Sequence, residues 1–175
     1  MRGVFDFDAR LDNMVKRENL GSIIDAAREL VANPFRPFLL IAGGVGNGKT
    51  HICQAVTREL NVSGIKTNYY SVKDLIDKLK GAIEDKLIDQ YRTAVEMLPG
   101  LVLDDYGANR GTEWELAELE GIIDFRYRKK LVTLMTTNLD PAIRPFSQRI
   151  YSRFMDGEIG RVFFNRAPDY RVVGG

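Results

Sequence analysis

Short runs of apolar residues alternate along this chain with longer segments in which apolar residues recur every three or four positions. The unbroken or nearly unbroken runs lie at 38–42, 101–103 and 131–136, and such runs are typical of strands that are covered on both faces. The periodic segments, such as 48–60, predict amphipathic helices. Strands that alternate with helices favour an α/β fold built on a parallel sheet.

Capping and turn residues set the expected bounds of these elements. Ser22 with Asp25 three residues later predicts the start of the first helix, and Asn33-Pro34 predicts its end. Thr112 and Glu115 form the pattern of a capping box at the start of a long helix. The full expectation, in chain order, is a helix from Ser22, a strand at 38–42, a helix at 48–60, a strand at 66–71, helical segments over 71–97, a strand at 101–103, a helix from Thr112 to Lys129, a strand at 131–136, a helix begun by Asp140-Pro141 and a strand at 161–165.

A glycine-rich segment separates the first predicted strand from the helix that follows it. Residues 43–50 read Gly-Gly-Val-Gly-Asn-Gly-Lys-Thr, which fits the phosphate-loop pattern G-x-x-x-x-G-K-[ST]. Glycines allow the backbone N–H groups to approach phosphate oxygens, and the helix N-terminus adds a partial positive charge. In this pattern Lys49 reaches the β- and γ-phosphates, and the hydroxyl of Thr50 ligates Mg²⁺. The segment therefore predicts a site for ATP and Mg²⁺.

The residues predicted to bind the nucleotide are Gly43, Gly44, Val45, Gly46, Asn47, Gly48, Lys49, Thr50 and His51. His51 is expected to pack and hydrogen-bond beside the loop rather than to act as a base. Cys53, two residues further along the helix, is expected to be a small buried residue.

Polar side chains end two of the predicted strands. Asp104 and Asp105 follow the strand at 101–103, and strand C-termini in open α/β sheets face the ligand crevice. Asp104 is expected to hold Mg²⁺ directly or through water, and Asp105 to polarise the attacking water as a general base. Asn138 would lie beside them, and orient that water, if its strand is a neighbour of theirs. The alternative is that both groups simply suit the turns that end strands.

The composition excludes several classes of protein. One cysteine and one histidine leave no intramolecular disulfide, cysteine zinc cage or two-histidine zinc site. No apolar run approaches the roughly 20 residues that cross a membrane, and the polar N-terminal stretch is unlike a signal peptide. We therefore expect a soluble cytoplasmic protein without a membrane partner.

Charge is unevenly distributed although the net charge is only +1. Residues 126–175 carry ten Lys/Arg against four Asp/Glu, which leaves the preceding part of the chain acidic. This asymmetry suits an anionic partner, although a solvated charged face is an equal alternative. Within 125–130, aromatic residues alternate with cations as in single-strand DNA binders, so Arg126 or Arg128 is a candidate contact to DNA or to another subunit. The same cations also suit the C-terminal end of a helix.

Taken in order, these motifs resemble a known family. Gly-Lys-Thr-His-Ile, Leu-Asp-Asp-Tyr-Gly-Ala, Thr-Glu-Trp, Phe-Arg-Tyr, Thr-Thr-Asn-Leu and Ser-Arg-Phe are similar to the motifs of AAA+ ATPases of the initiator and helicase-loader clade. The nearest resemblance is to the DnaC/DnaI-type replicative helicase loaders and the IstB transposition ATPases, over roughly residues 35–171. It implies a P-loop NTPase core with a five-stranded parallel sheet in the order 5-1-4-3-2, sandwiched by helices.

The resemblance also implies roles for single residues and for partners. Asn138 would be sensor 1, and Arg153 would be an arginine finger that enters the site of a neighbouring subunit, where a guanidinium stabilises charge on the γ-phosphate. A surface arginine on a helix is the alternative for Arg153. The implied partners are a replicative helicase, single-stranded DNA and further copies of the chain in an AAA+ oligomer.

Some features depart from the family. Such loaders carry a helicase-binding domain before the ATPase core, and the residues before the first strand are too few for one, so we expect an arm and helix at 1–34 and the AAA+ core at 35–175. Only 22 residues follow Arg153, so no full helical lid is expected. Arg171 is a candidate for approaching the nucleotide as sensor 2. Asn109 stands where the family often has an acid, and no role follows from it.

Three functions are consistent with these residues. The first is an ATP-hydrolysing AAA+ helicase loader that binds single-stranded DNA. The second is a nucleotide-gated adaptor of the IstB type that assists transposition, with slow turnover because Asp105 replaces the longer glutamate. The third is a small-molecule P-loop kinase, which needs an acceptor pocket and a mobile arginine-bearing lid that the sequence does not reveal.

Overall fold

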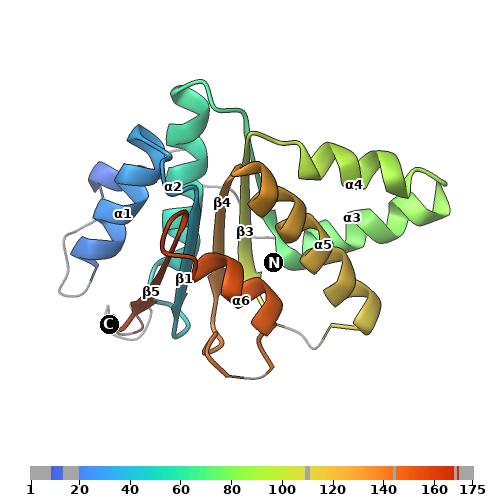
Figure 1. The fold of residues 1–175 in the computed structure, drawn as a ribbon. Coiled ribbons are helices and arrows are strands. Elements are labelled where there is room, and N and C mark those ends of the chain that lie inside the picture. The colour runs from blue at the N-terminus through green and yellow to red at the C-terminus, as the bar shows by residue number, and fades with distance from the viewer. Residues whose placement is uncertain (1–8, 14–19, 109–110, 144, 168, 170–175) are drawn as a thin grey trace.

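Five parallel strands form one sheet at the centre of the computed structural model, which describes residues 9–13, 20–108, 111–143, 145–167 and 169. The strands are β1 (Phe38–Gly43), β2 (Thr67–Ser71), β3 (Gly100–Tyr106), β4 (Val132–Thr137) and β5 (Gly160–Asn165). Their order is β2-β3-β4-β1-β5, and every neighbouring pair is parallel (Figure 1). The expected α/β fold and strand order are therefore confirmed.

Helices cover both faces of the sheet, so the molecule has three layers (Figure 1). On one face lie η1 (Leu11–Asn13), α1 (Gly21–Ala32) and α2 (Lys49–Val62). On the other lie α3 (Val72–Glu84), α4 (Ile88–Glu96), α5 (Glu113–Lys129) and α6 (Gln148–Phe154). None of the helices in the described part of the chain is long and apolar enough to cross a membrane.

The interior strand β1 is covered by apolar side chains on both faces of the sheet. Side chains of a strand point alternately to opposite faces, and all five residues 38–42 are buried. Leu39 and Ile41 belong to the core under α1 and α2, whereas Phe38 and Leu40 belong to the core under α3 to α6. The unbroken apolar run in the sequence is therefore the signature of a strand covered on both sides.

Two helix starts differ from the expected ones. α1 begins at Gly21 and ends before Asn33, so the predicted helix is confirmed, whereas the predicted side-chain cap at Ser22 is wrong because no described side chain caps this helix. Asp140 does not begin a helix either. Its carboxylate accepts a hydrogen bond from the Ala142 N–H at 2.9 Å, a local turn that competes with helix formation. The helix in this region is α6, which starts later and is capped by Ser147.

The helical segment predicted over 71–97 is two helices with a sharp break between them. Ser71 caps α3 as expected, since its side chain accepts a hydrogen bond from the Asp74 N–H. The chain then turns at Lys86, which has a φ of 60°, and α4 begins at Ile88. The capping box of Thr112 and Glu115 at the start of α5 is confirmed, with both of its hydrogen bonds present.

Candidate nucleotide-binding and hydrolysis site

The phosphate-loop segment lies between the end of β1 and the start of α2, as the sequence predicts. Gly46 and Gly48 have φ values of 73° and 90°, which place both in the left-handed region that favours glycine. Gly48 is also the N-cap residue of α2, so the free N–H groups of this helix begin at the loop. The backbone geometry is that of an anion-binding loop at a helix N-terminus.

Lys49 is held inside the loop rather than extended into solvent. Its side chain is largely buried, and Nζ donates hydrogen bonds to the carbonyls of Gly43 at 2.9 Å and Gly44 at 2.6 Å and to Oδ1 of Asn47 at 3.1 Å. These partners fix the ammonium group beside the loop N–H groups. The positive charge is thus placed where a phosphate chain would meet the loop.

Asn47 connects the loop to β5, the edge strand that pairs with β1. It is 1% exposed, and its Nδ2 donates to the Asn165 carbonyl at 3.1 Å, while Asn165 Nδ2 donates to the Asn47 carbonyl at 2.9 Å. This reciprocal pair ties the loop to the end of β5. The contribution of Asn165 escaped the sequence analysis, because 118 residues separate it from Asn47 and no local pattern marks it.

Asp104 is a buried carboxylate whose two oxygens accept bonds from different elements. Oδ2 accepts from the Tyr69 hydroxyl at 2.8 Å, and Oδ1 accepts from the Thr136 hydroxyl and from the Cys53 thiol, with sulfur at 3.7 Å. Burial, followed by the charge of Asp104, raises the pKa of both Tyr69 and Cys53, so both remain protonated donors. Burial of Cys53 is confirmed, while Tyr69 and Thr136 are partners that sequence reasoning missed.

Asp105 adopts a backbone conformation that is unusual for its residue type. Its φ is 63°, and the pairing of β3 with β4 shifts between Leu103 and Tyr106, on either side of the acid pair. The Asp105 N–H donates to Thr136 Oγ1 at 3.0 Å, which helps to hold this strained conformation. Strain of about 1–3 kcal/mol is characteristic of functional positions. Here it turns the Asp105 side chain away from the core, while Asp104 stays buried.

Asn138 meets Asp105 at the edge of the sheet. Its Nδ2 donates to Asp105 Oδ1 at 2.7 Å, so the expected juxtaposition of the two strand ends is confirmed. Burial, and next the charge of Asp104, raises the pKa of Asp105, while Lys49 opposes that shift. Cys53 of α2 contacts Asp104, and the charge of Lys49 acts on the pKa of Asp105. The loop and the acid pair therefore lie at one site.

The residues of this site fit a magnesium nucleotide. The loop offers N–H groups and an ammonium to phosphate oxygens, and Thr50 is exposed in the first turn of α2. Carboxylate and hydroxyl oxygens are the ligands that Mg²⁺ prefers. Asp104 accepts two bonds on Oδ1 and one on Oδ2, so Oδ2 has a second lone pair that suits a metal-bound water. His51 is half-buried beside the loop.

The C-terminal part of the described chain borders the same loop. The Asp169 carboxylate lies against Gly46, where an added Cβ would come within 1.8 Å of Oδ1. Arg171, the candidate for sensor 2, lies outside the described residues, as does Asn109.

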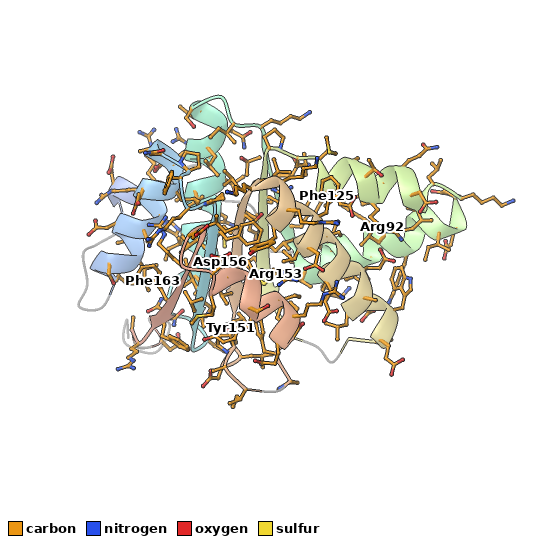
Figure 2. All side chains as sticks on the ribbon, in the orientation of Figure 1. Arg92, Phe125, Tyr151, Arg153, Asp156 and Phe163 are labelled. Carbon is orange, nitrogen blue, oxygen red and sulfur yellow. The ribbon has the colours of Figure 1, made fainter. Side chains whose placement is uncertain are left out.

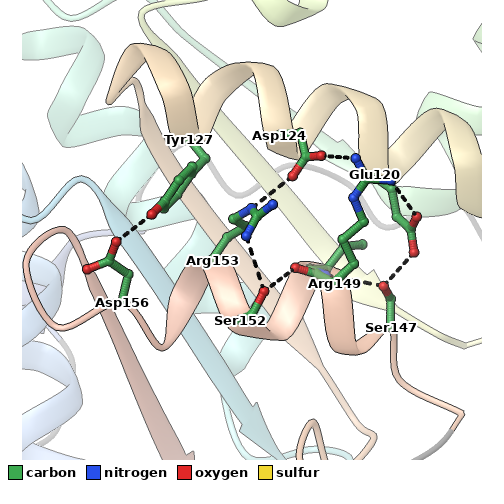
Figure 3. A network of polar contacts seen from close by, with 9 residues as sticks. Glu120, Asp124, Tyr127, Ser147, Arg149, Ser152, Arg153 and Asp156 are labelled. Carbon is green, nitrogen blue, oxygen red and sulfur yellow. Dashed lines mark hydrogen bonds and ion pairs between the residues drawn. The ribbon is translucent and has the colours of Figure 1, made fainter.

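Arg153 does not lie at the phosphate loop of its own chain. It is on α6, its Nε donates to Asp124 Oδ1 on α5 at 2.9 Å, and its guanidinium lies 5.0 Å from the centre of the Tyr127 ring (Figures 2 and 3). Among the described residues, its hydrogen bonds and ion pairs are to α5 and to Ser152 of its own helix. One chain therefore does not bring this arginine to its own acid pair.

Arg126 cannot contact DNA or another subunit, so that prediction is wrong for this residue. Its side chain is 0% exposed, and Nε and Nη2 donate to Thr133 Oγ1 at 3.0 Å and to the Val132 carbonyl at 2.6 Å. Nη1 donates to three carbonyls at the end of α4 and just beyond, those of Val95, Glu96 and Leu98. Burial lowers the pKa of Arg126 to about 9. Arg128, by contrast, is exposed.

Comparisons with known proteins identify the family and the fold of this chain. The model of the family described as IstB-like ATP binding protein matches residues 27–149. The replicative helicase loader DnaI of Bacillus subtilis is 29% identical over 104 residues, which cover 59% of this chain and 33% of DnaI. The chain spans about a third of the length of the curated relatives it matches first.

Two solved structures show the same fold. The DnaC helicase loader has a TM-score of 0.75 and 26% identity, covering 90% of this chain and 97% of that one. The replication initiator DnaA bound to AMPPCP and single-stranded DNA has a TM-score of 0.85 and 23% identity, covering 94% of this chain and 51% of that one. The predicted P-loop AAA+ architecture is confirmed by these similarities.

Proposed function

The chain belongs to the family of IstB-like ATP-binding proteins, and on that premise we propose that it is an AAA+ ATPase that hydrolyses ATP to ADP and phosphate. We further propose that it acts in DNA replication, in the cytoplasm, as a helicase loader that binds single-stranded DNA and a replicative helicase. The observation that carries the ATPase proposal is the meeting of the phosphate loop with Asp105 and Asn138 at one edge of the sheet.

Binding of the nucleotide rests on residues 43–51. The loop N–H groups and the start of α2 bind the phosphates, and Lys49 turns its ammonium from the loop carbonyls toward the β- and γ-phosphates. Thr50 and Asp104 would hold Mg²⁺, which would neutralise charge that develops on the phosphates.

Hydrolysis rests on the acid pair and its neighbour. Asp105 is the general base that accepts a proton from the attacking water, and Asn138 fixes the Asp105 carboxylate and orients that water. Tyr69 and Thr136 donate hydrogen bonds to the Asp104 carboxylate and hold it in place. Charge on the γ-phosphate is stabilised by Arg153 of a second copy of the chain, because Arg153 is remote from the loop of its own chain.

The proposed partners have support of different kinds. The relative DnaI is a replicative helicase loader, and the structural neighbour DnaA is bound to single-stranded DNA. The chain covers only part of such proteins, so the helicase and DNA contacts are proposals for this chain. Among its own residues, exposed Arg128 is a candidate contact for DNA or for another subunit, whereas Arg126 is not.

A second candidate function is a nucleotide-gated adaptor of the IstB type with slow turnover. Two observations favour it, namely the family match itself and the aspartate at 105, which is shorter than glutamate and already bonded to Asn138. This candidate binds the nucleotide with the same residues and differs in the rate of hydrolysis.

ATP turnover of the chain and of its Lys49→Ala variant, with and without single-stranded DNA and over a series of protein concentrations, tests the proposal. We expect turnover per chain to rise with concentration and with DNA, and to be lost in the variant. Tight ATP binding with negligible turnover under every condition would contradict the ATPase proposal and favour the adaptor.

A further inference from the structure

One face of α5 and the helix α6 are joined by a network of charged and polar side chains, which we call the α5–α6 network (Figure 3). Its members are Glu120, Asp124 and Tyr127 of α5, Ser147, Arg149, Ser152 and Arg153 of α6 and its N-cap, and Asp156 just after α6. The three α5 residues are spaced three or four positions apart, so they lie in a row on the same side of the helix.

Two contacts with α5, an ion pair and a cation–π contact, restrain the side chain of Arg153. Asp124 accepts a hydrogen bond from Nε at 2.9 Å, and the Tyr127 ring lies 5.0 Å from the guanidinium carbon. The side chains of Arg153 and Asp124 are 33% and 15% exposed, so this ion pair is largely shielded from water. An ion pair and a cation–π contact together fix both the direction and the plane of the guanidinium.

The restraints themselves are held by further contacts. The Tyr127 hydroxyl donates to Asp156, which holds the ring in place under the guanidinium. The second oxygen of Asp124 accepts from Arg149. Burial opposes ionisation of Asp124, but hydrogen bonds from Arg153 and Arg149 outweigh it and lower the pKa of the carboxyl. Asp124 is therefore a fixed anion at neutral pH.

The atom that makes the ion pair matters for what Arg153 is able to bind. The bond to Asp124 goes through Nε, on the inner side of the guanidinium. Phosphate oxygens are bound by the two terminal amino groups of an arginine, which form a fork. The ion pair therefore orients the side chain without using either terminal amino group, and of these two groups Nη1 donates to Ser152 Oγ at 3.4 Å.

We propose that Asp124 and Tyr127 are positioning residues that hold the guanidinium of Arg153 ready for the γ-phosphate bound by a second copy of the chain. This inference rests on the proposed function, in which Arg153 acts across a subunit interface. A long arginine side chain loses much rotamer freedom when it is fixed, and the network fixes it before assembly rather than at the moment of reaction. The two α5 residues contribute through Arg153 and do not touch the nucleotide.

The test compares Asp124→Asn with Glu120→Gln, at a protein concentration where turnover per chain no longer rises. Glu120 is a matched control, since it lies one turn earlier on α5 and contacts Ser147 at 2.7 Å and Arg149 at 3.7 Å, and in the described part of the chain no hydrogen bond or ion pair joins it to Arg153. We expect kcat to fall about tenfold in Asp124→Asn with an unchanged KM for ATP, because a misplaced group acts on the transition state. Glu120→Gln should stay within about twofold of the parent.

A double mutant separates positioning from general damage to the fold. If Asp124 acts through Arg153, Asp124→Asn will cause no further loss in an Arg153→Ala background. A further tenfold loss there, or a rise in kcat of the single variant, would overturn the inference. If Arg153→Ala itself leaves turnover unchanged, the proposed role of Arg153 fails and the inference fails with it, whereas a loss in Arg153→Ala without one in Asp124→Asn overturns the inference alone.

Tyr127 provides an independent pair of variants in case Asp124→Asn folds poorly. Tyr127→Phe keeps the ring under the guanidinium and loses only the hydroxyl bond to Asp156, so kcat should fall less than in a variant that lacks the ring. Tyr127→Leu removes the ring and should lower kcat about threefold. Equal values for the two variants would contradict a role for the ring.

Discussion

The phosphate-loop edge of the sheet and the α5–α6 network differ in how much of their chemistry one chain completes. At the edge, Lys49, Asp104 and Asn138 each have partners within the chain, and the loop, β3 and β4 meet there. In the network, Arg153 is oriented just as firmly, but it is remote from the loop of its own chain. Under the proposed function, this difference means that each chain carries a nearly complete nucleotide site together with the arginine that completes another chain's site.

The largest expected effect is that of Asp105→Asn, which disables the site at the phosphate-loop edge of the sheet and leaves the α5–α6 network intact. Asp105→Asn removes the general base but keeps an oxygen for Asn138, so we expect ATP binding to persist and turnover to fall by roughly 10²–10³-fold. Asp140→Asn, at an exposed carboxylate, is the control and should change neither quantity. Nucleotide binding by fluorescence and single-turnover hydrolysis would measure both, and full activity in Asp105→Asn would remove this residue from the mechanism.

The next effect concerns stability and sharpens the comparison between two arginines on α5. Arg126→Met leaves carbonyls at the end of α4 without their donor, so the free energy of unfolding should fall by about 3 kcal/mol. Arg128→Met, at an exposed position, should change it by less than about 0.5 kcal/mol. Urea denaturation measures both values. Equal stabilities of the two variants would show that the buried guanidinium does not anchor α4.

The smallest effect is a difference in how the two regions respond to acid. Asp105 must be ionised to accept a proton, and burial with the charge of Asp104 raises its pKa. Turnover should therefore decline as the pH falls through the raised pKa of Asp105, at a higher pH than an ordinary aspartate would require. Asp124 has a lowered pKa, so this carboxyl remains ionised over the same range.

A pH profile of kcat, recorded beside the thermal unfolding temperature, checks this order. We expect kcat to decline before the unfolding temperature does. A common midpoint for the two would indicate that acid acts through the whole fold rather than through Asp105.

Sequence alone predicted the parts of the site that are built from short segments. The phosphate loop, the acid pair and Asn138 each follow an apolar strand, and the parallel sheet brings the ends of those strands to one edge. The strand order also followed from the resemblance to known ATPases. These features are local or depend on topology, so no side-chain contact had to be known in advance.

The parts that sequence did not predict depend on pairs of residues far apart in the chain. The bond from Tyr69 to Asp104 spans 35 residues, and the pairing of Asn47 with Asn165 spans 118. Arg126 shares the aromatic and cationic pattern of its neighbours, and only packing of α5 against α4 and β4 shows that it is buried. The predicted cap at Ser22 and the predicted helix start at Asp140 were wrong, because no described side chain caps α1 and Asp140 forms a local turn instead.

The central claim is that two chains together make one hydrolysis site, and a mixture of two inactive variants tests it most directly. Lys49→Ala lacks a working phosphate loop but keeps Arg153, whereas Arg153→Ala keeps the loop and lacks the arginine. We predict that equal amounts of the two, each nearly inactive alone, regain roughly a quarter of the parent turnover when mixed, because random pairing of neighbours joins an intact loop to an intact arginine in that fraction of interfaces. Turnover of the mixture that only equals the sum of the separate variants would contradict the claim.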